Sequence, residues 1–203
     1  MKVVVVTGGI GSGKSEVCRI MYDKGCTAQY NADARVKSLY VEKNGLLESI
    51  EASLDCVLRD DEDVFQPRFL AQVIFSDNEA LKKVEALVFP ALLEDFETFR
   101  KDNTEADIIL FESATILEKP QFKGFGDVVV LVDASLQTRL ERACNRDKAS
   151  VEAVRARMSS QLLMNSLSQG NTDPRVDFVL ANTSSLAELE LKVEQLMSDI
   201  YKQ

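Results

Sequence analysis

Residues 3–15 read VVVVTGGIGSGKS, and this stretch decides the fold. A short run of β-branched residues is typical of a strand buried on both faces, and we expect one over Val3–Val6. The glycines after it predict a tight loop, and residues 14–24 have the pattern of a helix that ends at Gly25. The loop matches the pattern G-x-x-x-x-G-K-[ST] without a mismatch, in the strand–loop–helix context that the pattern requires.

The chemistry of this loop explains its spacing. Glycines allow several backbone N–H groups to point into one hollow, and the helix N-terminus adds partial positive charge. Lys14 supplies a mobile charge for the β- and γ-phosphates, and the Ser15 hydroxyl is a ligand that suits Mg²⁺. The pattern predicts a nucleoside triphosphate with Mg²⁺, and the absence of the guanine-reading motif NKxD favours ATP.

The composition excludes several other functions. The chain has 203 residues, no His, and a net charge of −9 from 33 acidic and 24 basic residues. Catalytic pairs that use His and His-ligated zinc sites are impossible. The acidic balance argues against nucleic acid and membrane surfaces as partners. Scattered cysteines (Cys18, Cys26, Cys56 and Cys144), with no signal peptide or transmembrane run, predict a cytoplasmic protein with reduced thiols.

The rest of the chain alternates strands with helices. Further strands are predicted at residues 28–32, 108–111, 128–132 and 176–180, and a C-terminal helix begins near Ser185 with a capping-box spacing to Glu188. This pattern predicts an α/β fold in one domain over residues 1–203, with a five-stranded parallel sheet and helices on both faces. Residues 36–104 are mostly helical by pattern, punctuated by Pro67 and Pro90, and are expected to form an inserted region.

Two acids follow predicted strands, where open α/β sheets bind ligands. Asp33 is placed to meet an acceptor hydroxyl, or else is a turn or helix-capping residue; its spacing alone leaves both open. Glu112 follows the strand at 108–111, as a metal-binding acid does in nucleotide-binding loops of this kind. It either holds Mg²⁺ through water or caps the strand end.

Five arginines lie between residues 139 and 157, and this clustering creates local positive charge in an acidic chain. Arg139, Arg142 and Arg146 share one helical face by their spacing. A guanidinium can clamp a phosphate, so the segment is suited to a lid; the alternative is a solvated helix with local acidic partners. We expect Arg139 and Arg155 to be surface residues.

The sequence resembles the dephospho-coenzyme A kinase family over nearly the whole chain. The loop TGGIGSGKS is followed, about eighteen residues after Ser15, by the acid Asp33. Further similar segments occur in the family's order: Arg68-Phe69-Leu70-Ala71 with Phe75, Phe89-Pro90, Ile116-Leu117-Glu118, Arg142 with Arg146-Asp147, Arg157 with Gln161, and Asp177 to Asn182.

The resemblance implies ATP-dependent phosphorylation of the ribose 3′-hydroxyl of dephospho-CoA. It implies a P-loop kinase domain with an acceptor-binding insertion at 36–104 and a lid at 137–165. Catalytic roles are expected for Asp33, Lys14, Arg142 and Arg146, and acceptor contacts for Asp33, Arg68 and Glu118. Nucleotide contacts are expected from Gly8, Gly9, Ile10, Gly11, Ser12, Gly13, Lys14, Ser15, Glu16, Arg157 and Asn182, with Ser15 on the metal.

Several positions depart from the family pattern. Asn31 replaces the first acid of D-A-D, Phe89 replaces a histidine, Ala114 replaces a proline, and Glu16 replaces a threonine. Arg68 and Glu118 also have structural alternatives, an ion pair within the insertion and the fixing of a loop. The rival functions are another small-molecule kinase and an inactive ATP-binding module. The oligomeric state is left open.

Overall fold

A computed structural model describes residues 1–25 and 28–202; Cys26, which was expected to be a reduced thiol, lies outside them. The chain forms two compact units. The sheet unit comprises residues 1–31 and 103–203, and the helical unit comprises residues 32–102. No helix of the described residues combines the length and apolar character needed to cross a bilayer.

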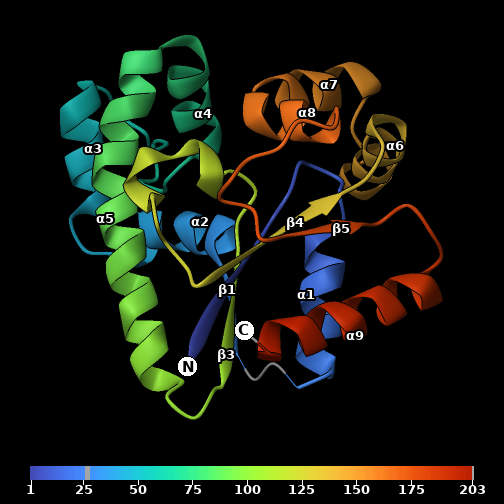
Figure 1. The fold of residues 1–203 in the computed structure, drawn as a ribbon. Helices are drawn as coiled ribbons and strands as arrows, with labels where there is room; N and C mark the ends of the chain where they lie inside the picture. The colour runs from blue at the N-terminus through green and yellow to red at the C-terminus, as the bar shows by residue number, and fades with distance from the viewer. Residues whose placement is uncertain (26–27, 203) are drawn as a thin grey trace. The chain divides into compact units, whose positions relative to one another are not determined.

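The sheet unit is built on five parallel strands in the order β2-β3-β1-β4-β5 (Figure 1). The strands are β1 (Lys2–Thr7), β2 (Ala28–Asn31), β3 (Ile108–Glu112), β4 (Val128–Asp133) and β5 (Phe178–Ala181). All five predicted strands are present, with ends that shift by one or two residues. The central strands β1, β3 and β4 are almost entirely buried, as their continuous apolar sequences predict.

Helices α1 (Lys14–Asp23) and α9 (Leu186–Lys202) lie side by side on one face of this sheet (Figure 1). Alternate strand residues such as Val4, Val6 and Leu110 pack with the apolar sides of both helices in one core. The predicted capping box of α9 is confirmed, because Ser185 and Glu188 hydrogen-bond to each other's backbone N–H groups. A second, aromatic cluster is formed by residues of β2, β3 and the following turns (Tyr30, Phe111, Phe122 and Phe125), in which Tyr30 stacks on Phe111 and the phenylalanines meet in tilted or edge-to-face pairs.

After β3 the chain makes two short 3-10 turns, η1 (Ile116–Glu118) and η2 (Pro120–Phe122), before entering β4. Three helices then follow β4: α6 (Leu136–Asp147), α7 (Val151–Ser159) and α8 (Leu162–Ser168). Ser135 caps α6 and Ser150 caps α7 through side-chain oxygens that accept from backbone N–H groups. Residues of α6 and α7, including Leu140 and Val154, form a small apolar core that receives the side chain of Ile10.

The helical unit contains α2 (Ala32–Glu42), α3 (Leu46–Leu54), α4 (Pro67–Ser76) and α5 (Asn78–Asp102). Pro67 begins α4, as predicted, but the expectation that Pro90 interrupts the helical region was wrong because Pro90 lies inside α5. Pro90 is exposed while Val88 and Leu92 on either side are buried. Ala86, whose carbonyl loses the hydrogen bond that an N–H at residue 90 would donate, is also exposed, so water can satisfy that carbonyl and packing retains the helix.

Candidate active site

The glycine loop connects β1 to α1 and is packed closely against other parts of the sheet unit. Gly9 lies so near Arg139 that a Cβ atom there would be 1.9 Å from the guanidinium nitrogen Nη2. Gly13 has a φ of 96°, and its Cβ would lie 2.1 Å from the amide nitrogen of Asn182. Larger residues at either position would push these side chains away, so the loop's glycines serve packing as well as backbone shape.

Gly13 begins α1 without a side-chain cap. The first N–H groups of this ten-residue helix are therefore suited to an anion. Glu16 in the first turn points away to Arg19, which donates to it at 2.6 Å and lowers the pKa of its carboxyl.

Arg139 corrects one of our expectations, because it is fully buried rather than on the surface. Its Nε donates to the carbonyl oxygen of Ile10 at 3.0 Å and its Nη1 donates to Ser168 at 2.9 Å. Burial lowers its pKa, while the charge of Asp133 opposes that effect. The helical pattern identified the face but could not reveal that the phosphate loop covers it.

The loop is also held from two other directions. The N–H of Ile10 donates to Gln161 at 2.8 Å, so both polar groups of residue 10 are engaged by the α6–α8 segment. The carbonyl of Ser12 accepts from the amide of Asn182 at 2.8 Å and from Arg142 at 3.4 Å. Arg142 and Asn182 therefore lie beside the loop. Their expected contacts with the nucleotide stay predictions. Gln161 was noted in a family pattern but was not selected as a site residue.

Lys14 is almost completely buried, and its ammonium donates to the carbonyl of Gly8 at 2.9 Å. Ser15 is exposed, and its hydroxyl donates to Glu112 at 2.6 Å. Glu112 is a buried carboxylate that also accepts from Asn31 at 2.9 Å. A hydroxyl and a carboxylate at this place are hard oxygen donors of the kind that Mg²⁺ prefers, so the residues fit that ion. Among residues 1–25 and 28–202 there is no cluster of three metal-binding His, Cys, Asp or Glu side chains.

Two of the predicted lid arginines lie farther along the segment and share one carboxylate. Arg146 donates to Asp147 through two nitrogens, at 2.7 and 3.1 Å, and Arg157 donates to it at 2.7 Å. These contacts hold the pKa of Asp147 far below its ordinary value. Arg155 is exposed, as expected.

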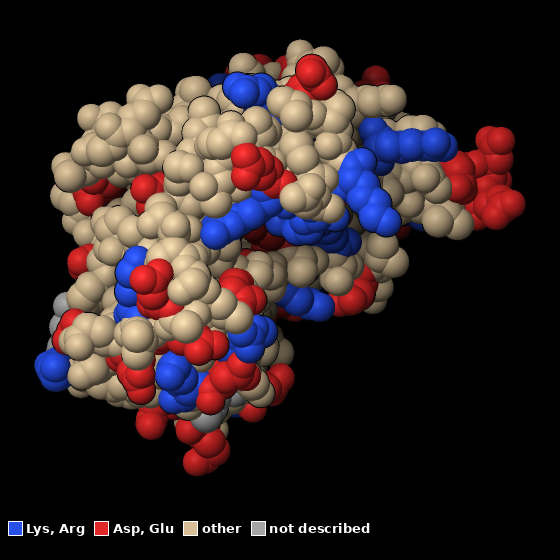
Figure 2. Space-filling view, turned by 90° about the vertical axis from the view of Figure 1, so that its right-hand side faces the viewer, with Lys and Arg blue, Asp and Glu red and all other residues tan. Residues whose placement is uncertain are grey.

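On the face in Figure 2, basic side chains gather in a band near the middle although the chain is acidic overall.

The remaining predicted residues have different surroundings. Glu118 accepts from the N–H groups of Leu163 and Met164 at the start of α8, which favours the alternative that it fixes a loop. Asp33 is exposed in the first turn of α2, and Arg68 is exposed in α4 with its guanidinium over the ring of Phe69. Asp33 and Arg68 both belong to the helical unit.

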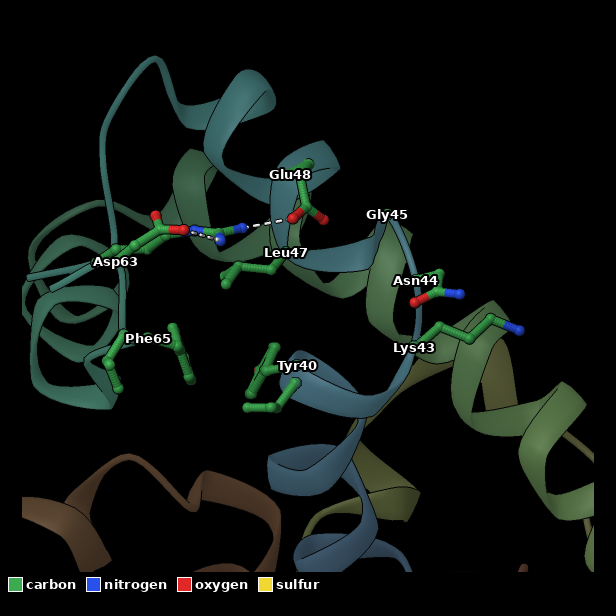
Figure 3. Close-up of a pocket in the computed structure, with 11 residues that line it drawn as sticks. Tyr40, Lys43, Asn44, Gly45, Leu47, Glu48, Asp63 and Phe65 are labelled. Carbon is green, nitrogen blue, oxygen red and sulfur yellow. Dashed lines mark hydrogen bonds and ion pairs between the residues drawn. The ribbon is translucent and has the colours of Figure 1, made fainter.

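The helical unit has a pocket of its own, with a volume of 350 Å³ (Figure 3). Tyr40 and Phe65 contact each other there, with ring centroids 5.3 Å apart. Arg59 is held at the pocket by ion pairs with Glu48 and Asp63. The full lining comprises Tyr40, Val41, Lys43, Asn44, Gly45, Leu47, Glu48, Arg59, Asp63, Val64 and Phe65.

A parallel sheet with its phosphate loop between β1 and α1, and with arginines of the following helices beside that loop, defines a P-loop kinase. The family model described as dephospho-CoA kinase matches residues 2–188. The chain belongs to the dephospho-CoA kinase family, and it is an enzyme of the phosphotransferase class.

Individual relatives agree with this assignment. The dephospho-CoA kinase of Porphyromonas gingivalis is 35% identical over 176 residues, which cover 87% of this chain and 85% of that protein. A Thermus thermophilus protein of known crystal structure has a TM-score of 0.81 and 28% identity, covering 98% of this chain and 97% of its own. The dephospho-CoA kinase from Campylobacter jejuni has a TM-score of 0.63 and 25% identity, with the same two coverages.

Proposed function

We propose that this enzyme transfers the γ-phosphoryl group of ATP to the ribose 3′-hydroxyl of dephospho-CoA and releases coenzyme A and ADP. The observation that carries the proposal is the complete phosphate loop, with Lys14 and Ser15 at the start of α1, in a chain of this family. Positioning and charge stabilisation do most of the work in phosphoryl transfer, and this loop supplies both.

The loop and Lys14 hold the triphosphate. The Lys14 ammonium lies against the Gly8 carbonyl, and we expect it to exchange that contact for phosphate oxygens when ATP binds. Ser15 would hold Mg²⁺, which when bound would supply positive charge to the triphosphate. Arg142 adds positive charge beside Ser12, and Arg146 and Arg157 supply it from the outer end of the lid.

Asp33 is assigned the acceptor. A carboxylate can orient the 3′-hydroxyl and accept its proton as the new P–O bond forms and the bond to ADP breaks. The acid stands two residues after Asn31, the last residue of β2, in the first turn of α2. Its place in the sequence, directly after a strand of the parallel sheet, is typical of ligand-binding acids in this class of fold.

The helical unit corresponds to the insertion that the sequence predicted at residues 36–104. We assign to it the binding of the acceptor beyond its 3′-hydroxyl. Its pocket combines apolar and aromatic side chains (Tyr40, Leu47 and Phe65) with polar ones (Lys43 and Asn44). Such a lining suits the pantetheine arm of dephospho-CoA, which carries both methyl and amide groups. Arg68, exposed on α4, is available for a phosphate of the acceptor.

The lid, predicted as residues 137–165, contains α6 except its first residue, all of α7 and the beginning of α8. Its closure would exclude water from the transferred phosphate and limit ATP hydrolysis. A cytoplasmic location is part of the proposal, supported by the thiols of Cys56 and Cys144, which form no disulfide.

The decisive experiment incubates the protein with ATP, Mg²⁺ and dephospho-CoA and identifies products by mass spectrometry, with a panel of nucleosides and nucleotides in parallel. We expect one phosphate to be added to the 3′-hydroxyl of dephospho-CoA. Turnover of a different acceptor alone would establish another small-molecule kinase. ATP binding without transfer to any acceptor would establish an inactive nucleotide-binding module.

A further inference from the structure

We propose that Glu112 is the positioning residue of the magnesium site, and that it orients the Ser15 hydroxyl through a carboxylate held by Asn31. The inference rests on the proposed ATP- and Mg²⁺-dependent function. It goes beyond that function by assigning the acid that serves the magnesium site. That acid is Glu112 at the end of β3, and not a residue at the end of β2.

The first argument is the hydrogen-bond geometry at Glu112. One carboxylate oxygen, Oε1, accepts from the Ser15 hydroxyl at 2.6 Å. The other, Oε2, accepts from the side-chain amides of Asn31 at 2.9 Å and Gln29 at 3.3 Å. The proton of Ser15 is therefore committed to Glu112, and the lone pairs of the serine oxygen are left for a cation. A carboxylate held in this way sets the direction in which Ser15 offers its lone pairs.

The second argument is electrostatic. Glu112 is 3% exposed, yet it has no ion pair with any Lys or Arg in the described parts of the chain. Its three hydrogen-bond donors are a hydroxyl and two amides, all neutral. A buried carboxylate with only neutral partners is costly, because its charge has lost water without gaining an opposite charge. A divalent cation at Ser15 would compensate that charge.

The third argument is the register of the two strands. Asn31 at the end of β2 pairs directly with Glu112 at the end of β3. Two carboxylates in these positions would repel each other, whereas an amide donates to a carboxylate. The pair therefore holds one negative charge, and it lies on the β3 side.

The test measures metal binding directly and needs no acceptor. Mn²⁺ replaces Mg²⁺, and its affinity for the complex with a non-hydrolysable ATP analogue is measured by electron paramagnetic resonance. For Glu112→Gln we expect the Mn²⁺ affinity to fall about tenfold or more. Binding of the same analogue in EDTA should stay within about twofold of wild type, because the loop N–H groups and Lys14 are unchanged.

Two further variants sharpen the test. The double variant Asn31→Asp/Glu112→Gln moves the carboxylate from residue 112 to its paired position 31. It should recover part of the Mn²⁺ affinity that Glu112→Gln loses. Asp127→Asn is the matched control, because Asp127 accepts from the N–H of Val3 at the amino end of the strands. It should leave the Mn²⁺ affinity unchanged.

Wild-type Mn²⁺ affinity in Glu112→Gln, with or without a lower melting temperature, would overturn the proposal and leave Glu112 as a strand-end cap. If Glu112→Gln fails to fold, Glu112→Asp serves instead. It keeps the charge but withdraws it from Ser15, and wild-type Mn²⁺ affinity there would also overturn the proposal. The two proposals can fail separately. If Glu112→Gln loses Mn²⁺ binding and the wild-type protein does not phosphorylate dephospho-CoA, the proposed function is refuted while the role of Glu112 is upheld.

Discussion

The guanidinium of Arg139 donates from Nε to the carbonyl oxygen of Ile10 at 3.0 Å, across 129 residues of sequence. This contact joins α6 to the tip of the phosphate loop. Arg139 also donates to Ser168, while its Nη2 is buried without a hydrogen-bond partner among the described residues. Arg139 is therefore a buried charge that is held both by the phosphate loop and by Ser168 of α8.

Replacing Arg139 should weaken nucleotide binding more than it weakens the fold. In Arg139→Met the loop tip loses a charged hydrogen bond, and we expect the Kd for ATP to rise roughly tenfold. Thermal stability should change little, because an apolar side chain can occupy a site where a charge was poorly compensated. Calorimetric titration and thermal melting check this, with the exposed Arg155→Met as control. An unchanged Kd would show that the anchor is dispensable.

Removing Lys14 should impair chemistry in a folded protein. In Lys14→Ala the transferred phosphate loses its nearest mobile charge, and kcat is expected to fall about 10²–10³-fold. Steady-state assays with saturating ATP measure this, and circular dichroism verifies the fold. A modest change in kcat with a large rise in the KM for ATP would assign Lys14 to binding alone.

Asp33→Asn tests the acid assigned to the acceptor. The amide keeps the size of the side chain but cannot accept the proton, so kcat should fall about 10²–10⁴-fold. The Kd for ATP should remain close to wild type. Single-turnover assays and ATP titration provide the two readouts. A wild-type kcat would remove Asp33 from the mechanism and leave it as a residue of the first turn of α2.

The ion pairs of Asp147 with Arg146 and Arg157 should make a small, pH-dependent contribution to the stability of the fold. Arg146 and Arg157 lower the pKa of Asp147, so the folded state binds the proton less readily than the unfolded state. The stabilisation is therefore complete above the ordinary pKa of an aspartate and is lost as the pH falls through the lowered value.

For Asp147→Asn we expect a loss of about 1 kcal/mol or less at pH 7, because the ion pairs are largely exposed. Urea unfolding at pH 7 and near pH 3 measures the difference from wild type. That difference should shrink at the lower pH, and a constant difference would mean that charge is not its cause.

The pocket of the helical unit gives a prediction about substrate affinity. Phe65→Ala should raise the KM for dephospho-CoA several-fold and leave the KM for ATP unchanged, because Phe65 belongs to the pocket lining. Phe75→Ala is the control, since Phe75 is a 75% exposed aromatic residue of the same unit. Equal effects of the two variants on the KM for dephospho-CoA would place the acceptor elsewhere.

Much of the fold could be predicted from sequence because its signals are local. The valine run, the glycine loop and the capping box act within a few residues, and the structure contains each of them. Pro90 was misjudged for the complementary reason. Packing of α5 on both sides of Pro90 outweighs the loss of one hydrogen bond, and local pattern does not include packing.

The sequence by itself determined that this chain binds nucleotide phosphates, because loop, lysine and serine are contiguous and their chemistry depends on backbone shape. Only the tertiary structure decided what Arg139, Gln161 and Glu112 do. Their partners (Ile10, Ile10 and Ser15) lie between 97 and 151 residues away. An arginine on a polar helix face or an acid after a strand has the same local pattern whether it is solvated or buried. Burial and long-range contact, which arise only when the sheet assembles, make the difference.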